Sequence, residues 1–480
     1  MATHLDLLVE GVATLQQQLP IWQEEDNYYR GKHVRPFAPQ GVNKEYRALQ
    51  EMAVAPWLRL VAKAPVQRLR VDGFRTDAKA DADMKVWTNY WKSNRLDSRQ
   101  RIVYIDAVKH GRGVISVQRN PRNREQPRIL VESPRDVFVA YDDVDVFTPK
   151  WAIKTWSSVE GKTDVFAGKL VNNAVVYTSS EWARYRKTDG RPWEARAGGK
   201  NPLGHVPFVE FRPEQDSLGR PMSMLRPLFP MQRAIDTMRF DLLLAAQFSA
   251  YRQRAVTGFD PVLRDEKGEI IWQKDSEENL KINPANGQPM PVLVDLGRPG
   301  VDRMQIFPGA DTKIWDLPES NLGNYVSVIK MLVQQLAAIA QVPPQYLLGD
   351  MANLSGEALD AAESTLGSLS EDLKREFGSS WEDTMHLANV AAGGNGLGLA
   401  SEAIWGDAVA KSFGVVVDGI VKLITSGFPR QAAWEMIPGA TQVKVQQWMD
   451  EAQSELDGLN PYANALGIAQ ALGERDGATQ

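Results

Sequence analysis

The chain has 480 residues, of which 43% are hydrophobic and 24% charged, a balance that excludes a wholly disordered polypeptide. It contains no cysteine, which excludes disulfide frameworks, thiolate metal sites and cysteine nucleophiles together. An uninterrupted apolar run of about 18 residues and a secretory signal pattern are both missing, so the sequence predicts no membrane-spanning segment. We expect a chain of about three structural regions that is made in the cytoplasm.

Charge is distributed unequally along the chain. Residues 1–230 hold 36 Lys and Arg against 27 Asp and Glu, a net charge of +9, whereas the remaining residues hold 19 against 33, a net charge of −14. This asymmetry indicates two surfaces with different partners, and an uneven scatter of solvated charge is the alternative. The total of −5 argues against a general nucleic-acid-binding protein.

Helical periodicity is typical of the first hundred residues. Apolar residues from Leu7 to Leu19 recur on one helical face, and we expect Pro20 to end this helix. Aromatic residues lie among Lys and Arg between Trp87 and Arg135. This second pattern fits either stacking on nucleic acid or the packing of an amphipathic surface.

From about residue 102 the sequence takes the character of β-strands. Predicted strands cover residues 113–117, 128–132, 136–141, 175–177 and 182–185. Turn residues separate them, and Asp189-Gly190 is a predicted hairpin turn. A meandering antiparallel sheet is the simplest account. Together with the helical segments before and after it, this sheet predicts an α+β fold.

Two long helices follow, with an insertion between them. The helices are predicted at 231–252 and 324–341, and both carry apolar residues on more than one face. The Pro- and Gly-rich block between them, residues 256–320, contains short predicted strands at 269–272 and 292–294. A helix, a small β insertion and a second helix form a specific arrangement, in which the insertion lies at one tip of a helical pair.

The last third of the chain is predicted to be helical. Pro343-Pro344 ends the second long helix, and a Gly- and Asn-containing loop follows it. Apolar residues at steps of three and four then run from Leu359 to Met385, which predicts one long amphipathic helix that ends near Gly393. Shorter helices are predicted at 407–426, 430–436 and 442–455.

The motifs of common enzymes are missing from this sequence. The five histidines are scattered without metal-ligand spacing, and no Gly-x-Ser-x-Gly elbow occurs. Gly198-Gly199-Lys200 fails as a phosphate loop, because Glu194 and Asn201 stand where Gly and Ser or Thr are needed. We therefore expect no enzymatic activity, no metal and no cofactor.

Four segments, taken in order, resemble portal proteins of tailed bacteriophages, the siphophage-type head-to-tail connector family found in many actinobacterial phages. The segments are Tyr28–His33, Val66–Phe74, His205–Phe211 leading into the helix through Asp241, and Ile339–Leu359. Each motif alone is weak, but four of them around a helix–insertion–helix arrangement are fairly specific. Past about residue 430 only the helical character supports the resemblance.

The resemblance implies the phage portal fold, with a mixed wing, a two-helix stem, a small α/β clip and a helical crown. The implied regions are the wing at 1–220, the first stem helix at 221–255, the clip at 256–320, the second stem helix at 321–342, the tunnel loop at 343–357, a long helix returning to the wing at 358–405, and the crown at 406–480.

The resemblance also implies a function. Such proteins form a ring, commonly of twelve subunits, at one capsid vertex of the virion, where double-stranded genomic DNA passes during packaging and ejection. The ring is assembled in the host cytoplasm. The implied partners are the terminase large subunit, head-completion or adaptor proteins, and the major capsid and scaffolding proteins, with no membrane. The alternative is another capsid- or tail-associated structural ring protein without a DNA channel.

One segment is expected to meet the DNA. Residues Gly349, Asp350, Met351, Ala352 and Asn353 are small, flexible or polar and would form the tip of the tunnel loop, while Tyr346, Leu347 and Leu348 would anchor its base by burial. An ordinary interhelical connection is the alternative. Residues 343–480 hold 7 basic and 19 acidic residues. If these acidic residues line a channel, they would let DNA slide by repelling its phosphates, although acidic helices kept soluble by charge remain the alternative.

Overall fold

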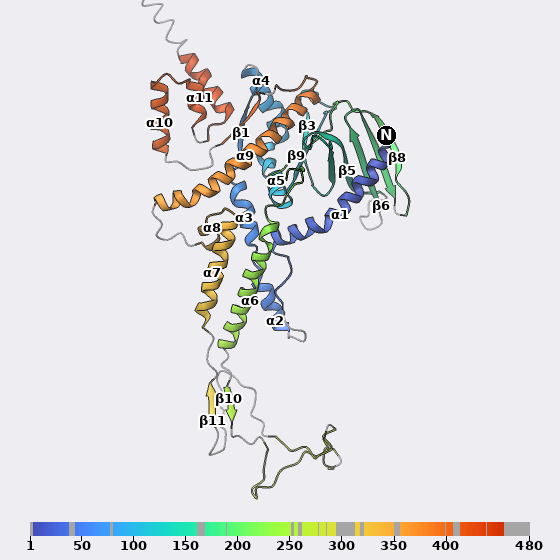
Figure 1. The fold of residues 1–480 in the computed structure, drawn as a ribbon, viewed down its shortest axis with the longest axis vertical. Helices are drawn as coiled ribbons and strands as arrows, with labels where there is room; N and C mark the ends of the chain where they lie inside the picture. The colour runs from blue at the N-terminus through green and yellow to red at the C-terminus, as the bar shows by residue number, and fades with distance from the viewer. Residues whose placement is uncertain are drawn as a thin grey trace, which may run out of the picture. The chain divides into compact units, whose positions relative to one another are not determined.

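A computed structural model gives the fold (Figure 1) and describes residues 3–37, 44–76, 80–160, 169–188, 190–250, 254–257, 262–276, 278–284, 286–293, 313–316, 321–349, 356–398, 400–406, 413–437 and 439–455. Contacts between residues divide the chain into two compact units. The first comprises Met1–Val34, Val54–Ala234 and Leu332–Gln480, and the second comprises Arg35–Ala53 and Ile235–Met331. Helices and strands together give the α+β class that the sequence predicts.

The first helix is longer than predicted. Helix α1 spans His4–Arg30, begins with a capping box between Thr3 and Asp6, and passes through Pro20 without ending there. The prediction that Pro20 ends the helix is therefore wrong. Pro20 and Gln16 are both exposed, so the carbonyl that loses its helical hydrogen bond lies on the solvent side. Burial of residues further along, such as Trp22, holds the last turns in place.

A five-stranded antiparallel meander forms one layer of the first unit. Its strands are β4 (Val137–Tyr141), β5 (Pro149–Glu160), β6 (Lys169–Thr178), β7 (Glu181–Thr188) and β8 (Glu194–Lys200), paired in that order. Helix α1 packs on one face through Leu8, Leu15 and Trp22, which meet Trp151 and Ile153 of β5. Figure 1 shows α1 lying along this sheet. The prediction of one meandering sheet is therefore wrong in part, because the predicted strands at 113–117 and 128–132 lie in a second sheet, and β5 and β8 were not predicted. Asp189 of the predicted hairpin turn lies outside the described residues.

A second sheet and the long helix enclose an aromatic core. The elements are α3 (Trp57–Val66), α5 (Leu96–His110), β2 (Gly113–Gln118), β3 (Arg128–Glu132), β9 (Phe208–Phe211) and α9 (Gly356–Ala392), with the strands in the order β3-β2-β9. Tyr104 of α5 stacks on Phe377 of α9 at 5.1 Å between ring centroids. Trp381 donates a hydrogen bond from Nε1 to Oη of Tyr104 at 2.6 Å. The apolar stripe predicted for α9 therefore faces the core.

The aromatic residues near position 90 serve packing. They lie in the segment formed by α4 (Ala80–Lys85), the π-helical turn η1 (Val86–Trp91) and the 3-10 turn η2 (Lys92–Asn94). Trp87, Tyr90 and Trp91 are almost fully buried, and Trp91 contacts Trp381 edge to face at 4.7 Å. Buried rings cannot stack on bases, so the packing alternative holds for these three residues.

The C-terminal helices attach to a small two-stranded sheet. Strand β1 (Val71–Arg75) pairs with β12 (Glu402–Trp405), and helices follow at α10 (Phe413–Thr425), α11 (Arg430–Glu435) and residues 442–455. The side-chain amide of Gln442 accepts from the backbone N–H of Phe74 at 3.2 Å and donates to its carbonyl at 3.1 Å. Gln442 thus extends the edge of β1 as a neighbouring strand would.

The second unit contains α2 (Lys44–Ala53), most of α6 (Phe229–Ala250) and the first part of α7 (Leu322–Ile339). Strand β10 (Arg254–Thr257) pairs with β11 (Lys313–Asp316). Within 262–293 the described residues form isolated antiparallel bridges, such as Trp272 with Pro291. The predicted strand at 269–272 therefore appears as two isolated bridges, of Ile270 with Arg264 and of Trp272 with Pro291. The described part of that at 292–294 forms one bridge, of Leu293 with Val262.

Helix α7 is long and apolar enough to cross a membrane by length and composition alone. The sequence predicted no such segment because Lys330 and other polar residues interrupt the apolar run. Only 17% of this helix is buried, and Val326, Met331 and Ile339 are exposed. An apolar helix surface of this kind requires cover from another surface.

Candidate functional site

The predicted tunnel loop begins with a short helix. Helix α8 (Pro344–Leu348) has Pro343 as its N-cap and Pro344 in its first turn, an arrangement that favours a helix start. Gly349 ends α8 at φ 69°, in the left-handed region that favours glycine. Asp350, Met351, Ala352 and Asn353 lie outside the described residues, as does the predicted N-cap Ser355. Helix α9 starts at Gly356.

The three predicted anchors lie in different surroundings. Leu347 is 4% exposed and Leu348 is half-buried, whereas Tyr346 is 39% exposed. The Tyr346 hydroxyl donates a hydrogen bond to Oε1 of Glu363 on α9 at 2.9 Å. Tyr346 is therefore held by a polar contact at its tip more than by burial of its ring.

Arg68 completes a polar clasp with these two residues. Its Nη2 lies 3.1 Å from Oε2 of Glu363 and donates to Oη of Tyr346 at 3.3 Å. The Arg68 side chain is 10% exposed and that of Glu363 24% exposed, so solvent screens this ion pair only in part. We call Arg68, Tyr346 and Glu363 the loop clasp, because Tyr346 precedes the predicted loop tip and Glu363 follows it.

Sequence reasoning did not find the loop clasp. Arg68 falls inside a segment that carries the family resemblance, but nothing local distinguishes it from its neighbours. Glu363 occupies one of many polar positions on an amphipathic helix. Because 278 positions separate Arg68 from Tyr346, only the tertiary structure brings them together.

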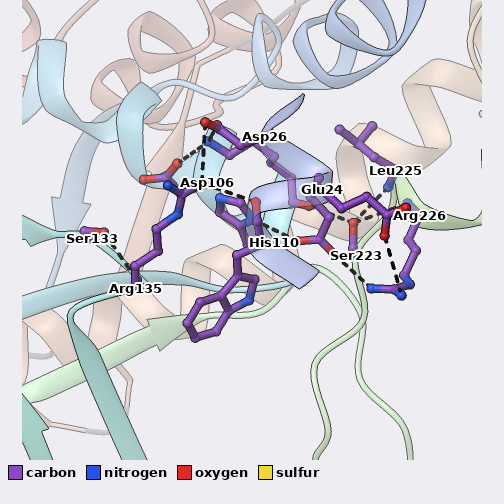
Figure 2. Close-up of polar contacts among 12 residues, drawn as sticks. Glu24, Asp26, Asp106, His110, Ser133, Arg135, Ser223, Leu225 and Arg226 are labelled. Carbon is purple, nitrogen blue, oxygen red and sulfur yellow. Dashed lines mark hydrogen bonds and ion pairs between the residues drawn. The ribbon is translucent and has the colours of Figure 1, made fainter. Parts of the chain in front are cut away.

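A second polar constellation is a buried ionic network beside the start of α6 (Figure 2). Asp26 of α1 lies at its centre, 3.0 Å from Nζ of Lys109 and 2.9 Å from Nε of Arg30. Arg135, at 3.4 Å, also faces it. Burial opposes ionisation of Asp26, but the hydrogen bond and charge of Lys109, with Arg135 and Arg30, outweigh it and hold the pKa of this carboxyl below its usual range.

The neighbouring residue Glu25 behaves in the opposite way. Oε2 of Glu25 lies 2.8 Å from Nδ1 of His110, and both side chains are nearly inaccessible. Burial is the main cause that raises the pKa of Glu25 to about 8. Burial, with the charges of Lys109 and Arg135, lowers the pKa of His110 to about 3. At neutral pH the two groups therefore form a neutral hydrogen-bonded pair rather than an ion pair.

The network connects α1 and α5 to the segment that leads into α6. Ser223 donates from Oγ to the carbonyl of Lys109 at 2.7 Å, and the N–H of Met224 donates to the carbonyl of Val108 at 3.2 Å. Tyr28 of α1 stacks on Phe229, the first residue of α6, at 3.8 Å. These contacts determine where the chain enters α6 within the first unit.

Known proteins resemble this chain over most of its length. Residues 12–458 match the family model described as phage portal protein, SPP1 Gp6-like. The chain belongs to this family. The match confirms the resemblance that the four sequence segments indicated.

Two portal proteins of mycobacterial phages are also similar to this family member. The portal protein of Mycobacterium phage D29 is 26% identical over 439 residues, which cover 88% of this chain and 84% of the relative. The portal protein of Mycobacterium phage L5 is 26% identical over 408 residues, which cover 82% and 77%. A phage portal protein is a structural component of the virion, and within the described part of this one no cluster of three or more His, Asp or Glu forms a metal site.

Proposed function

We propose that this protein forms a ring, with twelve subunits as the family commonly has, at one capsid vertex, and that the ring is the channel for packaging and ejection of double-stranded DNA. The family match across residues 12–458 is the observation that carries the proposal. In this proposal the ring also docks the terminase large subunit and head-completion or adaptor proteins, and contacts the capsid and scaffolding proteins. Assembly takes place in the host cytoplasm.

The exposed apolar surface of α7 supports association between subunits. Val326, Met331 and Ile339 each leave more than two fifths of their surface exposed. Identical heterologous contacts repeated around an axis would cover such a surface in every subunit and close into a ring. The same surface would account for the membrane-like composition of α7 without a membrane.

The regional assignments belong to the same proposal. Residues 1–220 form the wing, 221–255 and 321–342 the stem, 256–320 the clip, 343–357 the tunnel loop, 358–405 the long helix and return, and 406–480 the crown. The second unit contains Ile235–Met331, which covers the proposed clip and part of each stem helix, and this supports a clip distinct from the wing. The same unit also contains Arg35–Ala53 of the proposed wing, so its limits and the proposed boundaries agree only in part.

The tunnel loop is the proposed DNA contact. Its tip is Gly349 to Asn353, and its base is held by Leu347, Leu348 and the loop clasp. The loop clasp supports this assignment because it links a residue before the tip, Tyr346, to a residue after it, Glu363. The two ends of the loop are thereby held close together. A tip that meets the duplex through shape and weak polar contacts reads no base sequence.

The first experiment is negative-stain imaging of the purified protein. Rings with a central hole are expected. Uniform monomers would contradict the proposal, and solid discs or rings closed at the centre would favour the alternative, a structural ring component without a DNA channel.

The second experiment reverses a charge at the loop tip. Asp350→Lys would place up to twelve added cations at one constriction if the ring has twelve subunits, and attraction to phosphates should slow translocation most at low salt. Asp143→Lys is the matched control, because Asp143 is 92% exposed on the β4–β5 turn. Packaging rates that are equal for both variants across a salt series would place the loop away from the DNA.

A further inference from the structure

Seven arginines follow the buried aromatic rings near position 90, and packing does not account for their charge. They lie within the first unit and are Arg95, Arg99, Arg101, Arg119, Arg122, Arg124 and Arg128. None of the seven forms an ion pair with a residue that the structure describes. Only Arg99 is half-buried, and the other six are exposed. Neither the ring nor the DNA channel assigns a role to these side chains.

Hydrogen bonds join the two stretches of chain that carry these arginines. One stretch is the turn between β2 and β3, and the other is the corner that begins α5. Asn94 of the corner donates from Nδ2 to the carbonyl of Pro127 at 2.9 Å and accepts at Oδ1 from the N–H of Ile129 at 2.9 Å. Arg95 and Arg128 adjoin these residues in sequence and are both exposed, so the two stretches present their arginines on one surface.

This surface carries few carboxylates of its own. We call residues 92–101 and 119–128 the arginine patch; it holds eight basic residues against two acidic ones, a net charge of +6. Of the two acidic residues, Asp97 already pairs with Lys92, whose Nζ lies 2.9 Å from its Oδ2. Because salt screens exposed charges beyond about 10 Å, the negative total of the whole chain does not cancel this local excess.

Arg95 has a backbone conformation that arginine rarely adopts. Its φ of 55° and ψ of 39° lie in the left-handed region, which favours glycine. Arg95 occupies the N-cap position of α5, but its side chain makes no capping hydrogen bond there. Glycine would suit both the conformation and the cap. The local structure therefore gives no reason for an arginine at this position, and a use for its charge is the remaining one.

We propose that the arginine patch binds the phosphate backbone of duplex DNA, outside the channel. The planar guanidinium group donates two parallel hydrogen bonds to phosphate oxygens, which makes arginine well suited to this contact. A protein partner would need apolar contact at the centre of the interface, whereas the one large apolar side chain within the patch, Leu96, is fully buried. The choice of DNA among polyanions rests on the proposed function, but the patch does not depend on the tunnel loop.

The experiment measures binding of a covalently closed DNA circle to the purified full-length protein across a salt series. A closed circle has no end to thread, so it cannot enter the channel of a preformed ring. Arg122→Gln combined with Arg128→Gln should lower the slope of log K against log salt by about two, about one for each lost phosphate contact. Arg95→Gly should also weaken binding, but without a loss of melting temperature, since glycine suits the left-handed conformation.

Arg191→Gln combined with Arg430→Gln is the control, because both arginines are exposed outside the patch and the change in net charge is the same. Circular dichroism melts establish that each variant remains folded. An equal fall of the slope in the control would overturn the proposal, since net charge alone would then explain binding. Binding of linear DNA but not of closed circles would refute the patch and leave the proposed channel intact.

Two further results would identify a different occupant and so refute the proposal. Polyglutamate that competes as well as DNA at equal charge would identify an acidic polypeptide. Loss of rings in the patch variants, with rings retained in the control, would identify an acidic surface on a second copy of this chain. Binding of closed circles that survives both Arg95→Gly and the double substitution would place the DNA contact elsewhere on the protein.

Discussion

At the scale of single residues, Glu25 and His110 give the folded protein opposite responses to pH. Glu25 has a folded pKa of about 8 against an ordinary 4.5, so its contribution to stability is complete below pH 4.5 and is lost as pH rises through 8. His110 has a folded pKa of about 3 against 6.5, so its contribution is complete above pH 6.5 and is lost as pH falls toward 3.

We expect Glu25→Gln to remove the first response. Gln keeps a hydrogen-bonding side chain but cannot ionise, so its stability relative to the native protein should rise between pH 5 and 8 by at most about 1.4 kcal/mol per pH unit. Denaturant unfolding across this range measures the slope. Glu24→Gln is the control, since Glu24 is 48% exposed. Parallel stability curves for Glu25→Gln and the native protein would show that Glu25 is ionised in the folded state.

Gly111 is a second residue whose position in the fold leaves no room for a side chain. It ends α5 at φ 72°, and a Cβ there would lie 2.6 Å from the backbone carbonyl carbon of Met222. Gly111→Ala should therefore cost both the left-handed conformation, about 1–2 kcal/mol, and a displacement of the segment before α6. Gly190→Ala separates the two effects, because Gly190 has the same φ and nothing within 4 Å. Equal losses of melting temperature in the two variants would refute the close approach.

At the scale of elements, the loop clasp joins α8 to α9. Glu363→Gln leaves the largely buried Arg68 without its counterion and should cost about 1–3 kcal/mol, whereas Tyr346→Phe removes one hydrogen bond and should cost about 1 kcal/mol. Both should speed hydrogen exchange at the Gly349 amide, which donates to the carbonyl of Gln345 at 2.9 Å.

Glu371→Gln is the control for the loop clasp. Glu371 also lies on α9, but it is 61% exposed and pairs with Lys374 three residues away. Its loss should change little, because exposed ion pairs contribute about 0–1 kcal/mol. Exchange at Gly349 that is identical in Glu363→Gln and Glu371→Gln would show that the clasp does not hold the root of the loop.

At the scale of the whole molecule, the first unit should unfold independently of the proposed clip, which lies within the second unit. Replacing residues 256–320 by a short Gly-Ser linker removes no residue of the first unit. The main thermal transition of the wing core should therefore remain, and calorimetry measures it. Docking of terminase should be lost. Normal DNA packaging by this variant, or loss of the wing transition, would contradict the regional assignment.

The sequence by itself determined the features that depend on local pattern. The stripe on α9, parts of β4, β6 and β7, and the absence of catalytic motifs all follow from spacing and residue type within short windows, whereas β5 and β8 were not predicted. The four segments that resemble portal proteins are also short local patterns, so the resemblance to that family does not depend on tertiary contacts. Of the candidate site, the sequence predicted the segment from Tyr346 to Asn353, which remains a proposal, and it did not indicate Arg68 or Glu363 of the loop clasp.

Only the tertiary structure decided the features that depend on distant residues. Pro20 remains inside α1 because the burial of residues such as Trp22 outweighs one lost hydrogen bond. Strand β12 exists because it pairs with β1, more than 300 positions earlier. The loop clasp and the pair of Glu25 with His110 likewise join residues that lie far apart in the sequence. The helix or strand propensity of a short segment does not depend on residues that are distant in the sequence. Burial and charge pairing with such residues arise only when the chain has folded.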